Sequence, residues 1–166
     1  MPPLEVGAMI APRVSLGSER RAPPATEVRA GVGIIVVDAR GRVLLEKRSD
    51  CGQWGLPGGR INPGEDIETA ARREVKEATG LDVRVTALLG VYSELPEHLA
   101  TYPGERKPVQ LVDVILVANV ISGRLHSSDE SGELAFFWPH GLPNDIVPPA
   151  VSPLRHYVRG ERGVIQ

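Results

Sequence analysis

Two glutamates in one short helical segment are the residues of this sequence best suited to chemistry. Residues 67–79 carry apolar side chains at helical spacing, with Asp66 suited to the N-cap and Gly80 to the position after the last turn. At 100° per residue, Glu74 falls inside the apolar stripe and Glu77 lies at its edge. A carboxylate among small apolar neighbours is costly unless it is paired or binds a cation, so Glu74 needs a partner.

Two kinds of partner fit Glu74, an arginine inside the fold or a metal cation. Glu77 projects from the adjacent turn toward the same point, and Ala70 and Ala71 leave room beside the two carboxylates. Such room suits a hydrated cation, because magnesium favours oxygen ligands and keeps several of its waters. At the level of the helix alone, both alternatives stay open.

The residues around this helix resemble the Nudix box, G-x5-E-x7-R-E-U-x-E-E-x-G-U, where U is aliphatic. The matching positions are Gly59, Glu65, Arg73, Glu74, Val75, Glu77, Gly80 and Leu81. One fixed position departs from the pattern, since Ala78 stands where the family has a glutamate that is often a metal ligand. The resemblance implies an α/β protein with the Nudix fold, a mixed β-sheet sandwiched between α-helices, over about residues 28–158.

The same resemblance implies a metal-dependent hydrolase of a nucleoside diphosphate linked to another moiety, with Mg²⁺ or Mn²⁺ as cofactor. It implies Glu74 and Glu77 as metal ligands, with the Gly59 carbonyl as a further one. It also implies that Glu65 and Arg73 hold the preceding loop against the helix. Together with Glu74 and Glu77, these two residues form the predicted catalytic set. The cation would neutralise charge on the pyrophosphate and lower the pKa of the attacking water.

Ala78 removes one anionic ligand from the predicted site, so we expect weaker cation affinity rather than no activity. Acidic residues from another loop can compensate. Asp129, Glu130 and Glu133 precede the sequence FFW, near where related enzymes often bring a late acidic ligand or base. Ordinary surface charge is the alternative interpretation of these three residues.

The sequence indicates the substrate less clearly than it indicates the reaction. Pro96 lies 16 residues after Gly80, a spacing that resembles the ADP-ribose pyrophosphatase subgroup, whereas the sequence WGLPGG resembles members that hydrolyse oxidised nucleoside triphosphates. Tyr92, Tyr102 and Trp138 can stack on a base, or they can pack in the core or at its rim. A Nudix domain that binds nucleotide or ADP-ribose without hydrolysis is the remaining alternative, and Ala78 favours it.

The elements that must position these residues alternate between strand and helix. A buried apolar run, the polar turn Asp38–Gly41 and a second apolar run predict a hairpin over residues 28–48. Further strands are expected within 81–94, 109–125 and 133–139, and a second helix within 148–160. We therefore expect one Nudix domain over residues 27–160, after an extended N-terminal arm (1–26) and before a C-terminal tail (161–166).

Composition limits the partners and the compartment. The chain has 166 residues, a formal net charge of −2 and a single cysteine, Cys51, so an internal disulfide is excluded and a reducing compartment such as the cytoplasm is expected. No window clusters five or more Lys and Arg residues, and no apolar run approaches the ~20 residues of a membrane span. We expect a small-molecule nucleotide as partner rather than nucleic acid or membrane, and leave a homodimer open.

Overall fold

The computed structural model describes residues 27–101, 106–128 and 131–166. The predicted arm, residues 1–26, lies outside the described residues, as do Tyr102, Asp129 and Glu130. The elements are β1 (Val28–Val37), β2 (Val43–Arg48), β3 (Trp54–Gly55), β4 (Gly58–Arg60), α1 (Ile67–Thr79), β5 (Leu81–Tyr92), β6 (Leu99–Ala100), β7 (Val109–Gly123), β8 (Ser131–Phe137), α2 (Pro148–Val158) and β9 (Val164–Ile165).

The strands form one mixed sheet. Its main path runs β3-β2-β1-β7-β5-β9, while β4 pairs with β1, β6 with β7 and β8 with β2. Strands β1 and β7 are parallel along the whole of β1, and β5 runs antiparallel to β7 with three irregularities in its register. The predicted hairpin, the three later strands and the mixed sheet are confirmed.

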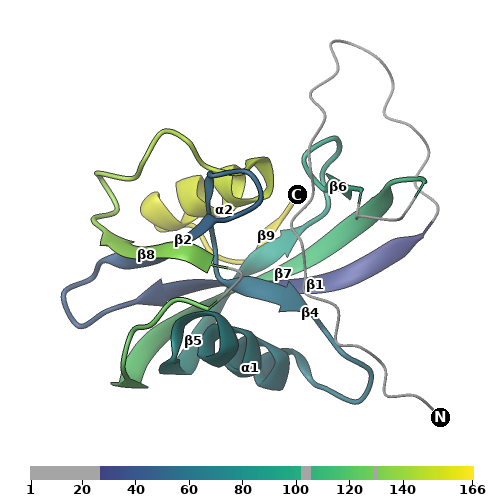
Figure 1. Ribbon diagram of the computed structural model, residues 1–166. Helices are drawn as coiled ribbons and strands as arrows, with labels where there is room; N and C mark the ends of the chain where they lie inside the picture. Colours follow the sequence, from purple (N-terminus) through teal and green to yellow (C-terminus); the bar gives the residue numbers. More distant parts are fainter. Residues whose placement is uncertain (1–26, 102–105, 129–130) are drawn as a thin grey trace.

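The two helices cover opposite faces of this sheet (Figure 1). Helix α1 packs Ala70, Ala71 and Val75 against one side of β1, whereas α2 packs Ala150 and Leu154 against the other. Strand β1 is therefore buried on both faces, which explains why its apolar run is continuous rather than alternating. The predicted arrangement of a sheet between helices is confirmed.

Helix α1 begins and ends where its capping residues predict. The Asp66 side chain accepts a hydrogen bond from the Thr69 backbone N–H at 2.7 Å, and Gly80 adopts the left-handed conformation with φ 75°. The helix therefore spans Ile67–Thr79. These two caps set the limits of α1, and the packing of its buried face sets the direction of Glu74.

The C-terminal residues belong to the domain, which corrects the predicted boundary at residue 160. Strand β9 pairs in parallel with β5 through Gly90–Val164 and Val91–Ile165. The backbone N–H of Gln166 also donates to the Val91 carbonyl at 3.0 Å. This pairing uses backbone groups of a distant strand, so the short polar sequence ERGVIQ gives no sign of it.

Neither α1 nor α2, the two helices in the described part of the chain, combines the length and apolar character that a membrane-spanning helix requires.

Candidate active site

Glu74 lies at the closest contact between α1 and β4. Its side chain is only 16% exposed, and its carboxyl group packs directly on the Cα atom of Gly59. A Cβ atom at residue 59 would stand 2.2 Å from the Glu74 Cδ atom, so any side chain there would displace the carboxylate. Gly59 therefore creates the space that Glu74 occupies.

Arg73 is the arginine partner that the position of Glu74 requires. Its Nη1 atom donates to Oε1 of Glu74 at 2.8 Å and to Oε2 of Glu77 at 3.2 Å. Within the described part of the chain, Oε2 of Glu74 accepts no hydrogen bond. One oxygen of Glu74 is thus held by the fold and the other is open to a further ligand.

The same guanidinium ties the preceding loop to the helix. Nε and Nη2 of Arg73 donate to the two oxygens of Glu65 at 2.6 and 2.8 Å, a bidentate pair. Glu65 also accepts the Asn62 backbone N–H at 3.0 Å, and Arg73 reaches the Arg60 carbonyl at 3.0 Å. These contacts are the loop-to-helix lock that the resemblance implied for Glu65 and Arg73.

The two carboxylates on Arg73 have opposite electrostatic environments. Hydrogen bonds from Arg73 and from the Asn62 backbone lower the pKa of Glu65 to about 2. Burial raises the pKa of Glu74, although the hydrogen bond and charge of Arg73 oppose this effect. Of these two carboxylates, Glu74 is therefore the one whose charge is less satisfied by the fold, and a cation beside it would favour its ionised form.

The backbone of β4 adds a candidate metal ligand, a glycine carbonyl oxygen. The register of β4 against β1 indicates which glycine carbonyl is available. Successive carbonyls of a strand in an antiparallel ladder point alternately toward the neighbouring strand and away from it. The Pro57 carbonyl accepts an N–H of β1, whereas the Arg60 carbonyl faces Arg73. By this alternation the Gly59 carbonyl points toward β1 and the Gly58 carbonyl away from it. The register therefore favours the carbonyl of Gly58 over the predicted carbonyl of Gly59.

These oxygens fit a magnesium or manganese ion that keeps part of its water shell. The donors are the open oxygen of Glu74, the exposed carboxylate of Glu77 and the Gly58 carbonyl, all of the hard type that Mg²⁺ prefers. Residues 27–101, 106–128 and 131–166 contain no group of three or more His, Cys, Asp or Glu side chains arranged to hold a metal. Ala78 lies half-buried one turn after Glu74.

The structure does not bring Glu133 and Trp138 to this site. Glu133 pairs with Lys47, on the sheet face that α2 covers, and is thus on the opposite face from Glu74. Trp138 follows the end of β8, is 47% exposed and stacks on His140. That end of β8 lies beside the hairpin turn after β1, whereas Gly59 pairs with Val32 in the middle of β1.

Tyr92 is a core residue, so of the two roles that the sequence left open for it the structure favours packing in the core over stacking on a substrate base. Its side chain is fully buried, and its hydroxyl is hydrogen-bonded to Nδ1 of His156 at 3.0 Å. Burial also raises the pKa of Tyr92 to about 12. Pro96 is exposed in the loop between β5 and β6, close in sequence to the buried His98.

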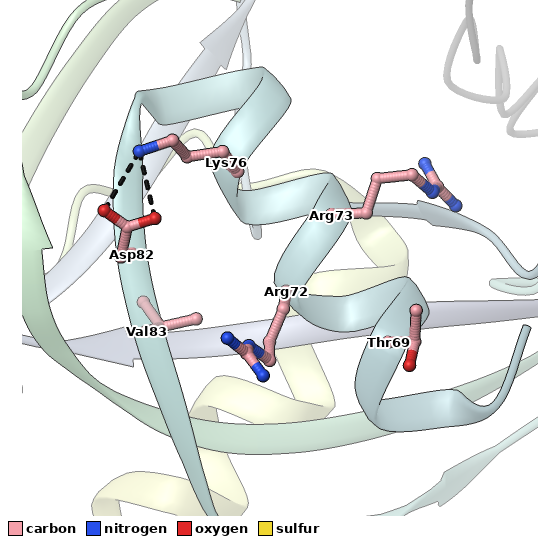
Figure 2. A pocket seen from close by; sticks show the side chains of 6 residues that line it. All are labelled: Thr69, Arg72, Arg73, Lys76, Asp82 and Val83. Carbon is pink, nitrogen blue, oxygen red and sulfur yellow. Dashed lines mark hydrogen bonds and ion pairs between the residues drawn. The ribbon is translucent and has the colours of Figure 1, made fainter.

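A surface pocket lies beside α1 but does not enclose the carboxylates. It is lined by Thr69, Arg72, Arg73, Lys76, Asp82 and Val83 (Figure 2). Lys76 crosses it to bind Asp82, while the Arg73 side chain is directed away from Asp82. Because Glu74 and Glu77 line no part of this pocket, we place the chemistry at the junction of α1 and β4 instead.

Sequence reasoning missed Asp113 and His98. Asp113 is a carboxylate inside the apolar run of β7, and His98 Nε2 lies 3.7 Å from its Oδ2 atom. A single acidic residue within a strand of β-branched residues is the same kind of signal that identified Glu74. It could have been recognised in the sequence, but its partners could not.

A family model described as the NUDIX domain matches residues 27–156. The chain belongs to this family. A curated Nudix relative, the ADP-ribose pyrophosphatase of Methanocaldococcus jannaschii, is 34% identical over 65% of this chain and 61% of its own length. A putative 8-oxo-dGTP diphosphatase of Bacillus subtilis is 30% identical over 81% of this chain and 83% of its own length.

The Nudix fold is also shared with solved structures. A NUDIX hydrolase from Nitrosomonas europaea matches with a TM-score of 0.68 and 25% identity, over 88% of this chain and 78% of the other. The chain spans less than two thirds of the archaeal relative, whose substrate is therefore a guide rather than an assignment.

Proposed function

We propose that this Nudix domain hydrolyses the pyrophosphate bond of a nucleoside diphosphate linked to another moiety, with ADP-ribose as the first substrate to test. The observation that carries the proposal is the buried Glu74 carboxylate, which packs on Gly59 and keeps one oxygen free of hydrogen bonds from the described residues. The relationship to an archaeal ADP-ribose pyrophosphatase supports this choice of substrate.

The residues of the chain have separable roles in this proposal. Glu74, Glu77 and the Gly58 carbonyl would hold Mg²⁺ or Mn²⁺, which supplies charge neutralisation on the pyrophosphate and acidifies the attacking water. Arg73 holds Glu74 and Glu77 in place, and through Glu65 it fixes the loop from β4. Hydrolysis adds one water across the phosphoric anhydride and yields two phosphate-bearing products.

Glu74→Gln tests the proposal most directly. The substitution keeps the size of the side chain and removes its charge, so we expect a folded protein whose turnover of ADP-ribose falls ~100-fold or more. Product formation measured with Mg²⁺ and with Mn²⁺ gives the turnover, and circular dichroism checks the fold. The exposed Glu68→Gln is the matched control on the same helix. Wild-type turnover in well-folded Glu74→Gln protein would remove the proposed role.

Two other functions remain as alternatives. Hydrolysis of an oxidised nucleoside triphosphate is favoured by the relationship to the putative 8-oxo-dGTP diphosphatase. A domain that binds nucleotide or ADP-ribose without hydrolysis is favoured by Ala78 and by the small set of acidic ligands in the described residues. A screen of nucleotides with both metals, scored for phosphate-containing products, separates all three.

A further inference from the structure

A second carboxylate lies across the glycine backbone from the candidate active site. Asp113 on β7 is in register with Gly31 on β1, and its side chain is 18% exposed. A Cβ atom at residue 31 would stand 2.3 Å from the Asp113 Oδ1 atom. As at Gly59, a glycine therefore makes the space that a carboxylate occupies.

His98 holds the other oxygen of this carboxylate. Its Nδ1 atom lies 3.1 Å from the Glu94 carbonyl, which can only accept, so Nδ1 carries a hydrogen. Its Nε2 atom is buried, has no hydrogen-bond partner and lies 3.7 Å from Oδ2 of Asp113. The 3.7 Å separation is longer than a hydrogen bond, and it places the His98 ring against the Asp113 carboxylate.

The Asp113 carboxylate is half-buried and has few partners within the described part of the chain. Apart from the long contact with His98, no residue in the described part of the chain donates to it. With 18% of its side chain exposed, the carboxylate can accept a hydrogen bond from solvent or from a ligand. Oδ1, which lies over Gly31, is the oxygen that the contact with His98 does not involve, so it is the candidate to accept a further hydrogen bond.

The place of Asp113 connects it to the pyrophosphate site. The Cβ position at Gly31 that lies 2.3 Å from Oδ1 is also 3.3 Å from the carbonyl oxygen of Gly59. Asp113 is on the α2 face and Glu74 on the α1 face, with the glycines of β1 and β4 between them. The residues that separate the two carboxylates thus have no side chains, and Asp113 lies beside the backbone of the strand that carries Gly59.

We propose that Asp113 accepts a hydrogen bond from a hydroxyl of the substrate's nucleoside ribose, with His98 as its positioning residue. The inference rests on the proposed function, since it takes the junction of α1 and β4 as the phosphate site. A carboxylate is a suitable acceptor for ribose hydroxyls and repels phosphate, which assigns it to the sugar.

Paired substrates test this assignment. We expect Asp113→Asn to raise KM for ADP-ribose by about 10- to 100-fold with little change in kcat, as for a lost hydrogen bond to a charged group. For analogues with 2′-deoxyadenosine or 3′-deoxyadenosine, the analogue that lacks the recognised hydroxyl should show a change of less than about 3-fold. His98→Asn should give a weaker version of the same pattern. Asp82→Asn, a paired surface carboxylate on β5, is the control.

Binding separates this inference from the proposed hydrolysis. Calorimetric titration of the same three compounds into Glu74→Gln protein and into Glu74→Gln/Asp113→Asn protein measures recognition without turnover. Equal loss of affinity for all three compounds, or no loss, overturns the role of Asp113 even if the wild type hydrolyses ADP-ribose. Discrimination between the sugars that depends on Asp113, in a wild type that hydrolyses none of them, supports the inference and removes the proposed function. If Asp113→Asn does not fold, Gly31→Ala, which displaces Oδ1, is measured instead.

Discussion

Glu74 and Asp113 are two solutions to one physical problem. Each is a carboxylate within an apolar element, burial raises the pKa of each, and a glycine on a neighbouring strand gives each its space. Glu74 is held by Arg73, its neighbour in sequence, at 2.8 Å. Asp113 is held by a histidine from another loop at the longer distance of 3.7 Å.

The difference teaches why one site is visible in a sequence and the other is not. The partners of Glu74 lie within two helical turns or in the adjoining loop, so their spacing is fixed by helix geometry and forms a motif. The partners of Asp113 come from β1 and from the loop after β5, which only the sheet brings together. Local geometry repeats from protein to protein as a pattern, whereas tertiary contacts do not.

The largest effects on enzyme kinetics are expected from substitutions of the two glycines that lie against these carboxylates. Gly59→Ala should displace the Glu74 carboxylate and lower turnover ~100-fold with every substrate, whereas Gly31→Ala should displace Asp113 and act mainly on KM. At Gly59 the close atoms all belong to the end of the Glu74 side chain, so stability should fall by only about 1 kcal/mol or less. At Gly31 the Gly59 carbonyl oxygen is also 3.3 Å away, so Gly31→Ala should cost more stability, about 1–3 kcal/mol. Steady-state kinetics and thermal melting measure the two quantities.

Two further glycines serve as controls for that prediction. A Cβ atom at Gly58 would stand 2.3 Å from the Val32 carbonyl oxygen, which is backbone, so Gly58→Ala should cost about 1–3 kcal/mol of stability. At Gly141 the atom nearest to an added Cβ would be 3.9 Å away, so Gly141→Ala should change neither turnover nor stability. Full turnover in Gly59→Ala protein would show that the position of Glu74 does not matter.

The stability of the metal-free protein should respond to pH in opposite directions at Glu65 and Glu74. Folding lowers the pKa of Glu65 from 4.5 to about 2, so its contribution is present above pH 4.5 and is lost as the pH falls toward 2. Wild type should therefore be more stable than Glu65→Gln at pH 6, and the difference should vanish near pH 2. Chemical unfolding at a series of pH values with a chelator measures it.

The contribution of Glu74 to stability depends on pH in the opposite direction. Because folding raises its pKa above 4.5, its favourable contribution is present below pH 4.5 and is lost as the pH rises through the raised value. Glu74→Gln should thus gain stability relative to the wild type between pH 4.5 and neutral pH, and Mg²⁺ or Mn²⁺ should reverse that gain. A Glu74→Gln protein that loses relative stability as the pH rises would contradict the assignment of burial as the dominant cause.

The smallest effect is expected at Ala78, the position that departs from the family pattern. Ala78→Glu adds a carboxylate one helical turn after Glu74, so Mn²⁺ should bind ~10-fold more tightly while the metal-free protein loses stability through charge repulsion. Calorimetric titration with Mn²⁺ and melting curves with and without the ion measure both changes. Weaker or unchanged Mn²⁺ binding would show that Ala78 serves packing alone, and would favour a non-hydrolytic domain.

Much of the fold was predictable because its signals are local. The caps Asp66 and Gly80 gave the limits of α1, and the turn Asp38–Gly41 gave the hairpin. The burial of Tyr92 and the separation of Trp138 from Glu74 were not predictable, since an aromatic side chain looks the same in the core, at a rim and in a binding site. Strand β9 also escaped prediction, because two paired residues carry almost no sequence signal.

By itself, the sequence determined the family, the limits and buried face of α1, and the choice of Glu65, Arg73, Glu74 and Glu77 as candidate site residues, because helix periodicity and capping act within a few residues of each other. Only the tertiary structure decided that Glu74 is paired with Arg73 while one of its oxygens stays open, that the register of β4 favours the Gly58 carbonyl, and that Asp113 meets His98 above Gly31. Those outcomes depend on which strands become neighbours and in what register, and register is set by the packing of the whole sheet against its two helices.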